Sequence, residues 1–276
     1  MKERILITVK TYPTLSKSHG ELVCTAGIRS DGSWVRLYPV PFRKLKDYER
    51  YHKYQWLTAN LIKRSDDPRP ESHTPEHGSI NLGDVIPAAN QWAERCRLVL
   101  DKGAVFDDMT KLISRANSNE LSLATYKPRE IIGLVIEPCD RDWPKNKICA
   151  AENAHRQGDL FADDEQFVKD LKLVDKLPYV FSYRFLDKDG TKRTLMIEDW
   201  EIGQLYWNCL KNAEGNEAIA IQKVKEKYVD QLAEKRDLHL FVGTTKQYHG
   251  WANNPFVIVG TFTPPQNRQP EFSLWE

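Results

Sequence analysis

Residues 20–46 read GELVCTAGIRSDGSWVRLYPVPFRKLK, and this stretch decides the fold that we expect for the N-terminal part of the chain. Residues 21–28 are typical of a β-strand, Asp31-Gly32 is a strong hairpin signal, and residues 33–40 form the returning strand. Both central residues of a type I′ turn need a positive φ, which glycine adopts freely and aspartate tolerates, so the sequence predicts that turn. Pro39 and Pro41 have no backbone N–H to donate to a sheet, so we expect the strand to end there.

The returning strand has two unlike faces, because successive side chains of a strand point to opposite sides. Val35 and Leu37 share the aliphatic face, whereas Trp34, Arg36 and Tyr38 place two aromatic rings around a guanidinium on the other. We interpret the aromatic face as a binding surface. The alternative is that Trp34 and Tyr38 are core residues and that Arg36 pairs with an acidic residue of the C-terminal half.

Hydrophobic periodicity and turn signals predict the other elements. The predicted strands are residues 4–10, 55–64, 130–137 (a buried strand), 179–186, 191–197, 238–244 and 255–263. The predicted helices lie near residues 88–102, 107–116, 199–212 and 217–236, with short helices after Pro41 and within the acidic segment 140–175.

These elements predict an α+β chain. Residues 1–66 would form a basic, β-barrel-like module similar to an OB barrel. Residues 67–83, which contain three prolines and no periodicity, would be a loop or linker. Residues 84–276 would form an acidic unit that mixes helices with antiparallel sheet.

Charge is distributed unevenly along the sequence. Residues 1–65 contain 13 Lys or Arg against 5 Asp or Glu, a net charge of +8, whereas the remaining residues carry a net charge of −7. This asymmetry suggests a polyanionic partner for the N-terminal part, although the two halves could instead neutralise each other across an interface.

The composition favours a cytoplasmic protein. The five cysteines are scattered without a CxxC pair, which fits reduced thiols better than a disulfide framework. No apolar run approaches the roughly 20 residues that span a bilayer, and the first residues do not resemble a signal peptide, so we expect no membrane partner.

Motifs of nucleotide and hydrolytic chemistry are absent from the sequence. It contains no GxxxxGK[ST], no GxGxxG after a strand, no GxSxG and no HExxH, and no cysteine–histidine spacing typical of zinc. We therefore predict no cofactor and no metal site. A divalent ion would be needed only if the chain were a nuclease, for which the available acids are Glu130, Glu137, Asp199 and Glu201.

The residues that favour nucleic-acid binding combine rings with positive charge. Barrels that bind single strands stack bases on aromatic side chains and pair the backbone with Lys and Arg. A second candidate is the loop between the last two predicted strands, which contains Tyr248. The predicted binding residues are Trp34, Arg36, Tyr38, Arg43, Lys44, Lys46, His249 and Trp251.

Residues 22–40 also resemble a pattern found in prokaryotic proteins with a dual OB-fold architecture. The matching positions are a cysteine, a small residue with glycine, a turn, and then Trp-hydrophobic-Arg, namely Cys24, Ala26, Gly27, Trp34 and Arg36. The resemblance covers about 20 of the 276 residues. It implies a small β-barrel with a role near nucleic acids.

Three functions follow as hypotheses. The first is a bacterial nucleic-acid-binding protein that prefers single-stranded DNA or RNA and belongs to a nucleic-acid processing or defence system, with the acidic unit binding a protein partner. The second is a metal-dependent nuclease or nucleotide-processing enzyme. The third is a protein–protein adaptor whose basic face docks an acidic partner.

Overall fold

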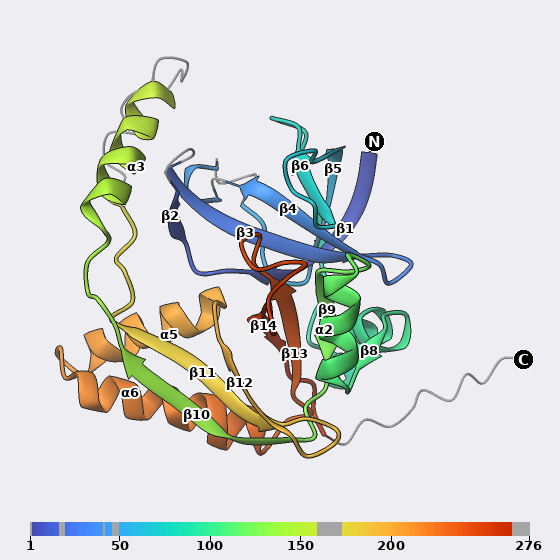
Figure 1. Cartoon of the computed structure of the whole chain (residues 1–276), viewed down its shortest axis with the longest axis vertical. Helices are drawn as coiled ribbons and strands as arrows, with labels where there is room; N and C mark the ends of the chain where they lie inside the picture. Colours follow the sequence, from blue (N-terminus) through green and yellow to red (C-terminus); the bar gives the residue numbers. More distant parts are fainter. Residues whose placement is uncertain (1, 17–19, 41, 46–49, 159–172, 267–276) are drawn as a thin grey trace, which may run out of the picture.

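The computed structural model of the chain describes residues 2–16, 20–40, 42–45, 50–158 and 173–266. A β-barrel forms the N-terminal part, and a second group of strands with helices packed on it forms the C-terminal part (Figure 1). The fold is α+β, as the sequence predicts. Within the described ranges, no helix combines the length and the apolar character that crossing a membrane requires.

Barrel 1, as we call the N-terminal barrel, is a closed barrel of five strands. Its strands are β1 (Lys2–Lys10), β3 (Gly20–Arg29), β4 (Trp34–Val40), β5 (Gln55–Lys63) and β6 (Ser72–Pro75). They pair in the order β1, β3, β4, β6, β5 and back to β1, with β4 and β6 parallel and the other pairs antiparallel. This connectivity is compatible with an OB-like barrel.

The interior of barrel 1 follows from the two-residue period of its strands. Val35 and Leu37 of β4 are fully buried and pack with Ile5 and Ile7 of β1, which confirms the inward aliphatic face. The inward residues of β5 join the same cluster: Leu57, Ala59 and Leu61. A single turn of 3₁₀ helix, η1 (Phe42–Lys44), follows β4 where a short helix was predicted.

The turn between β3 and β4 is not the predicted type I′ turn. Of its residues only Gly32 has a positive φ, of 89°, and its N–H donates to the carbonyl of Arg29 over 3.0 Å. Asp31 instead accepts hydrogen bonds from the backbone N–H and hydroxyl of Ser33, at 2.9 and 2.7 Å. A side chain at Gly32 would also lie 2.2 Å from the carbonyl oxygen of Lys102, so glycine is required there for two reasons.

The predicted linker, residues 67–83, contains strand β6 and the start of another strand. β6 pairs with both β4 and β5, and β7 (Asn81–Val85) extends the sheet from β5. The prolines of this stretch lie before and at the end of β6, so they interrupt little of the pairing. A further short strand, β2 (Thr14–Ser16), pairs with β3 in the segment that was expected to be a loop.

Helices and short strands connect barrel 1 to the C-terminal strands. The first is η3 (Asn90–Trp92), a left-handed turn in which all three residues have positive φ. One helix follows it, made of α1 (Ala93–Cys96) and the π-helical η4 (Arg97–Asp101). The strand β8 (Val105–Phe106) and the helix α2 (Met109–Asn117) follow. Both predicted helices of this region are therefore present. The α2 helix begins at Asp108, whose carboxylate accepts from the N–H of Lys111 over 3.0 Å.

The C-terminal strands form a three-stranded sheet and a four-stranded sheet, the second of which includes β8. Apart from β8, the strands are β9 (Leu123–Tyr126), β10 (Glu130–Pro138), β11 (Tyr179–Leu186), β12 (Lys192–Met196), β13 (His239–Thr244) and β14 (Phe256–Phe262). β10, β11 and β12 pair antiparallel, one parallel bridge joins Ile197 to Ile258 of β14, and β14, β13 and β9 pair antiparallel. Because β10 follows β9 after three residues, the two act as one bent first strand. We call this group unit 2.

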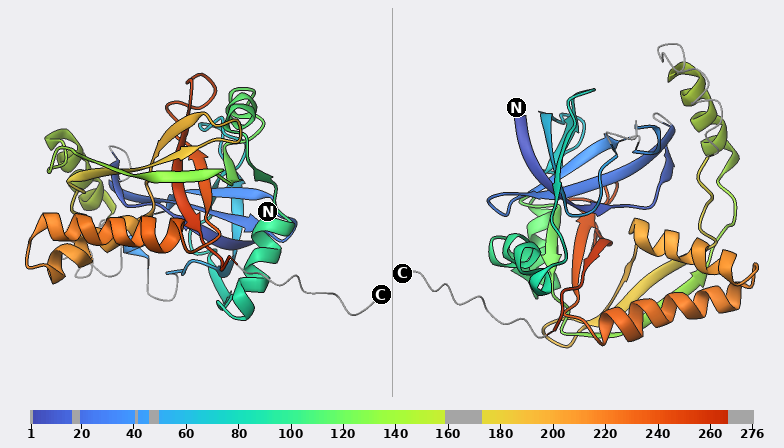
Figure 2. Two further views of the ribbon diagram at one scale, coloured as in Figure 1. Left: turned by 90° about the horizontal axis from the view of Figure 1, so that it is seen from below. Right: turned by 180° about the vertical axis from the view of Figure 1, so that it is seen from behind.

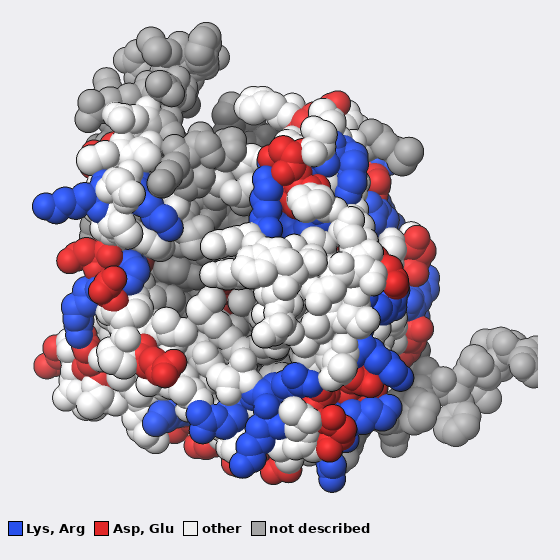
Figure 3. Space-filling model, in the orientation of Figure 1, with Lys and Arg blue, Asp and Glu red and all other residues white. Residues whose placement is uncertain are grey.

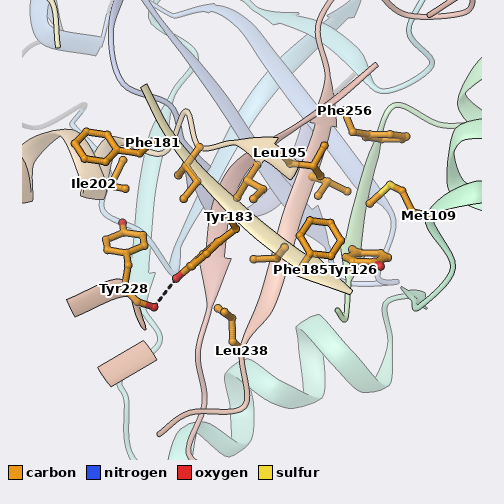
Figure 4. Close-up of a cluster of buried hydrophobic side chains, with 14 of the residues drawn as sticks. Met109, Tyr126, Phe181, Tyr183, Phe185, Leu195, Ile202, Tyr228, Leu238 and Phe256 are labelled. Atoms are coloured by element: carbon orange, nitrogen blue, oxygen red, sulfur yellow. Dashed lines mark hydrogen bonds between the residues drawn. The ribbon is translucent and has the colours of Figure 1, made fainter. Parts of the chain in front are cut away.

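Unit 2 encloses the largest apolar cluster, against which its helices pack. The helices in contact with it are α2, α5 (Trp200–Asn212), α6 (Glu217–Lys225) and the π-helical η6 (Glu226–Ala233). The helix α3 (Lys145–Gly158) lies instead beside β2 and β3 (Figure 1). Tyr183 of β11 and Tyr228 of η6 meet within the cluster, where the Tyr183 hydroxyl donates to the Tyr228 carbonyl over 2.7 Å (Figure 4). Strand β10 was predicted to be buried, but it is half-buried, because it is an edge strand and Ile132 points to solvent with 44% exposure.

The outer face of barrel 1 packs on the outer face of strands β13 and β14 of unit 2 (Figures 1 and 2). Leu6 and Ile28 of barrel 1 share one buried cluster with Phe241 and Phe262 of unit 2. The half-buried Trp34 adds an edge-to-face contact with Phe241, at 5.3 Å between ring centroids. The two parts therefore share a continuous apolar interface.

Candidate functional site

Arg36 is almost fully buried, with 1% exposure, so it does not form part of an exposed binding surface. Its guanidinium donates to the hydroxyl and the carbonyl of Ser122, over 2.6 and 3.1 Å, at the start of β9. The Ser122 N–H and hydroxyl in turn donate to the carboxylate of Glu71. The interpretation of Arg36 as an exposed contact is thus corrected: it joins β4 to unit 2 through a serine that also binds an acidic side chain.

Trp34 and Tyr38, the aromatic neighbours of Arg36, are both half-buried. Trp34 belongs to the interface with unit 2, as the alternative interpretation of the sequence proposed. Tyr38 lies at the other end of the strand, where the Arg64 guanidinium lies over its ring at 5.2 Å and donates to its carbonyl over 2.8 Å. Of these two residues, Tyr38 is therefore the one whose ring could face a ligand.

Of the three predicted basic residues after β4, only the Arg43 side chain is described. Arg43 is half-buried and forms an ion pair of 2.7 Å with Glu21, which is itself buried. Lys46 and the side chain of Lys44 lie outside the described residues. Figure 3 shows acidic and basic side chains interspersed at the margins of one face of the molecule, around a largely uncharged centre. On this face the charge asymmetry of the sequence does not produce a patch of one sign.

The two predicted binding residues of the loop between β13 and β14 differ in exposure. His249 is buried, with its ring nitrogens 3.0 Å from the Thr244 hydroxyl and 2.8 Å from the Asn119 side-chain oxygen, so it holds the loop in place. Trp251 is 67% exposed and lies 5.6 Å from the 43% exposed ring of Tyr248. These two rings form an exposed aromatic pair.

A pocket of about 210 Å³ lies between the outer face of barrel 1 and unit 2. Its walls come from β1, β3 and β4 on one side and from β9 and the β13–β14 hairpin on the other. We call it the barrel-face pocket, and its lining residues are Val9, Thr11, Cys24, Ala26, Arg36, Tyr38, Arg69, Leu123, Glu198, Thr244, Thr245, Lys246, Val257 and Val259. Mostly apolar walls with a few polar groups are typical of small-molecule sites.

Glu198 lines this pocket with a carboxylate that no described residue pairs. Its backbone is fixed, since its N–H donates to the Ile258 carbonyl and its carbonyl accepts from the N–H of Tyr12, both over 2.8 Å. Its carboxylate has no hydrogen-bond or ion-pair partner among the residues that the structure describes. Burial alone raises the pKa of Glu198, because no neighbouring cation offsets it.

The other end of the pocket is polar and cationic. The hydroxyl oxygen of Thr245 is buried and has no partner within the described part of the chain. Arg69 is buried and neutralised by Asp67, with two bonds of 2.9 and 2.7 Å, while it also donates to the Thr244 carbonyl over 2.6 Å. Lys246 is half-exposed at the rim and 3.2 Å from Asp66. The pocket thus has an acid at one end and cations at the other.

The acids of the nuclease hypothesis do not converge. Asp199 and Glu201 lie on either side of the Lys53 ammonium, at 3.9 and 2.8 Å, whereas Glu130 and Glu137 lie near opposite ends of β10. Burial and the charge of Glu201 raise the pKa of Asp199 to about 7 against the opposing effect of Lys53. Among the described residues, no group of three or more His, Cys, Asp or Glu is placed to hold a metal ion. Asp199 can therefore titrate near neutral pH, but the cation that the two acids share is the Lys53 ammonium rather than a metal ion.

Comparison with protein families divides the chain near the end of η4. Residues 105–276 match the model described as Domain of unknown function (DUF8757). The chain belongs to the DUF8757 family. Residues 1–101 match a second model, Domain of unknown function (DUF8758). A comparison with curated proteins gives no match.

In this DUF8757 chain, the sequence did not predict the pocket residues that lie outside the β3–β4 hairpin. Glu198 directly precedes the predicted helix cap Asp199 and has no motif around it. Arg69 lies in the stretch that was interpreted as a linker, and Thr245 is the first residue of the loop between β13 and β14. The one available signal was that Tyr38 and Lys246 belong to the two segments in which binding residues were expected.

Proposed function

We propose that this protein binds single-stranded nucleic acid, with one base entering the barrel-face pocket. The observation that carries this proposal is the position of the pocket on the outer face of β3 and β4, the second and third strands of barrel 1. OB-like barrels bind oligonucleotides on the face of these strands and on the loops beside it. The pocket includes both Tyr38 of β4 and Arg69 of the loop between β5 and β6.

We further propose that both parts of the chain are OB-like barrels. The support is the strand order of unit 2, in which the third and fifth strands are parallel and helices lie between the third and fourth. On this reading the loop of Tyr248 and Trp251 is the binding loop between the last two strands of the second barrel. It borders the pocket, because Thr245 and Lys246 of the same loop line it.

In the bound state, the base would lie between the apolar walls of the pocket. Val257 and Val259 form one wall, and Leu123 another. A neighbouring base of the strand would stack on Trp251, whose indole is exposed and held by a hydrogen bond of 2.8 Å to the Gln247 carbonyl. Lys246 at the rim would pair with a phosphate. Such a site holds few nucleotides and excludes a duplex, whose bases are paired and stacked.

The test is fluorescence anisotropy with short labelled single- and double-stranded DNA and RNA at several salt concentrations. We expect single strands to bind with a dissociation constant that rises with salt. Trp251→Ala removes one stacking ring, worth about 1–3 kcal/mol, and should weaken binding about 5- to 150-fold. Lys246→Ala should reduce the salt dependence, whereas the matched variant Lys211→Ala, also an exposed lysine, should not.

The absence of binding to any single strand at low salt would refute this function. Binding that Trp251→Ala and Lys246→Ala leave unchanged would place the nucleic acid elsewhere on the chain. The predicted cytoplasmic setting remains a proposal, supported by the five cysteines, all of which are free thiols.

A further inference from the structure

We infer that the barrel-face pocket selects guanine, and that the carboxylate of Glu198 makes this selection by accepting two N–H hydrogen bonds from the base. The inference rests on the proposed function, because it names the base that the pocket takes from a single strand. It depends on two polar side chains that line the pocket and have no hydrogen-bond partner among the described residues.

The first group is the Glu198 carboxylate. Removing a carboxylate from water is costly unless donors replace the lost hydrogen bonds. Other buried or half-buried acids near the pocket have such donors, since Arg69 binds Asp67 and Ser122 binds Glu71. Glu198, which is half-buried, has none among the described residues, although its backbone is fixed on both sides. A ligand that brings N–H groups to this position would supply what the protein does not.

Guanine matches this requirement better than the other bases. A carboxylate presents two acceptor oxygens side by side. The Watson–Crick edge of guanine carries two adjacent donors, an imino and an amino group, whereas adenine and cytosine pair one donor with one acceptor. Uracil and thymine place a single donor between two carbonyl groups. Ionised Glu198 can therefore form a two-bond contact with guanine alone.

The second group, the hydroxyl of Thr245, lies toward the cationic end. Glu198 is fixed beside Ile258, and the Thr245 N–H donates to the carbonyl of Pro255, three residues earlier along the chain. Three residues of a strand span roughly 10 Å. This is comparable to the length of one nucleotide from base edge to phosphate. A guanine at Glu198 would therefore place its sugar and phosphate near Thr245 and Lys246.

The experiment compares labelled oligo(dT) strands that differ only in one central base: dT, dG, dA or dC. We expect the strand with dG to bind about 5- to 150-fold more tightly than the others, the range for one two-bond contact to a base. Glu198→Gln should abolish this preference, so that the strand with dG binds no more tightly than oligo(dT). Glu137→Gln, at an exposed glutamate on β10, should keep the preference.

Cys24 supplies a readout that does not depend on affinity. Its half-buried thiol lines the pocket, so a bound dG strand should slow its alkylation by iodoacetamide, measured by mass spectrometry. The exposed Cys149 should react at an unchanged rate and serves as an internal control. If Glu198→Gln does not fold, Glu198→Asp serves in its place. Its shorter side chain keeps the charge but moves the carboxylate away from the base, so this variant should also lose the guanine preference.

The two hypotheses fail in different ways. Single strands that bind and protect Cys24 with no preference for guanine, or with a preference that both Glu198 variants retain, would overturn this inference and leave the proposed function intact. Single strands that do not bind at all would overturn the proposed function and the inference with it.

Discussion

Replacing Arg36 by methionine should weaken the connection between barrel 1 and unit 2. Arg36→Met keeps a long side chain but removes the charge and the two hydrogen bonds to Ser122, at 2.6 and 3.1 Å. Each hydrogen bond of a charged group contributes about 1.5–3 kcal/mol. Methionine in turn avoids the cost of burying a guanidinium, which offsets part of this loss. We expect the free energy of unfolding to fall by about 2–4 kcal/mol.

The measurement is urea unfolding followed by tryptophan fluorescence, to which Trp34 contributes from within the interface. The matched control is Arg97→Met, at an exposed arginine paired with Glu94 on one face of a helix, where a loss of at most about 0.5 kcal/mol is expected. The double variant Arg36→Met with Ser122→Ala should lose less than the sum of the single losses, because both changes remove the same bonds. A loss for Arg36→Met no larger than that for Arg97→Met would refute this account of the interface.

Three further predictions concern the C-terminal part. Because the pKa of Asp199 is raised from about 3.8 to about 7, its contribution to stability is present in full below pH 4 and is lost as the pH rises to 7. Asp199→Asn, which can still cap the helix, should remove this decline, of at most ~1.4 kcal/mol per pH unit, in unfolding experiments at each pH. A side-chain carbon at Gly203 would lie 2.2 Å from the Tyr12 ring, so Gly203→Ala should lower the melting temperature by an amount equivalent to about 1–3 kcal/mol; an unchanged melting temperature would contradict this packing. Tyr183→Phe leaves the buried Tyr228 carbonyl without its partner and should cost about 1–3 kcal/mol in urea unfolding, whereas no loss would mean that this hydrogen bond contributes nothing.

The local pattern of the sequence predicts most of the strands and helices. Val35 and Leu37 point inward because a strand with one buried face must alternate, and alternation can be read directly from the chain. Asp199 caps its helix as predicted, since its carboxylate accepts from the N–H of Glu201 over 3.2 Å. In both cases the cause lies within a few residues of the effect.

Features that depend on distant partners were not predictable in this way. Arg36 is separated by 86 residues from the serine that it binds, so its burial has no local signal. Strand β6 exists because β4 and β5 provide edges on both sides of it, which outweighs the prolines of its surroundings. The solvation of Glu198 depends on how two parts of the chain pack, and no spacing of residues reveals that.

The spread of the two groups of strands along the sequence has a consequence for the order of folding. Barrel 1 closes through strands that all lie within residues 2–75, whereas unit 2 is complete only when β13 pairs with β9 across an intervening hairpin and several helices. Pairing across a long segment costs more chain entropy and is slower, so unit 2 should form after barrel 1. Until then the outer face of β3 and β4 remains uncovered, and the walls that β9, β13 and β14 give to the pocket do not exist. A ligand that fills the pocket would therefore bind only the completed chain and would favour, by mass action, the last step of its folding.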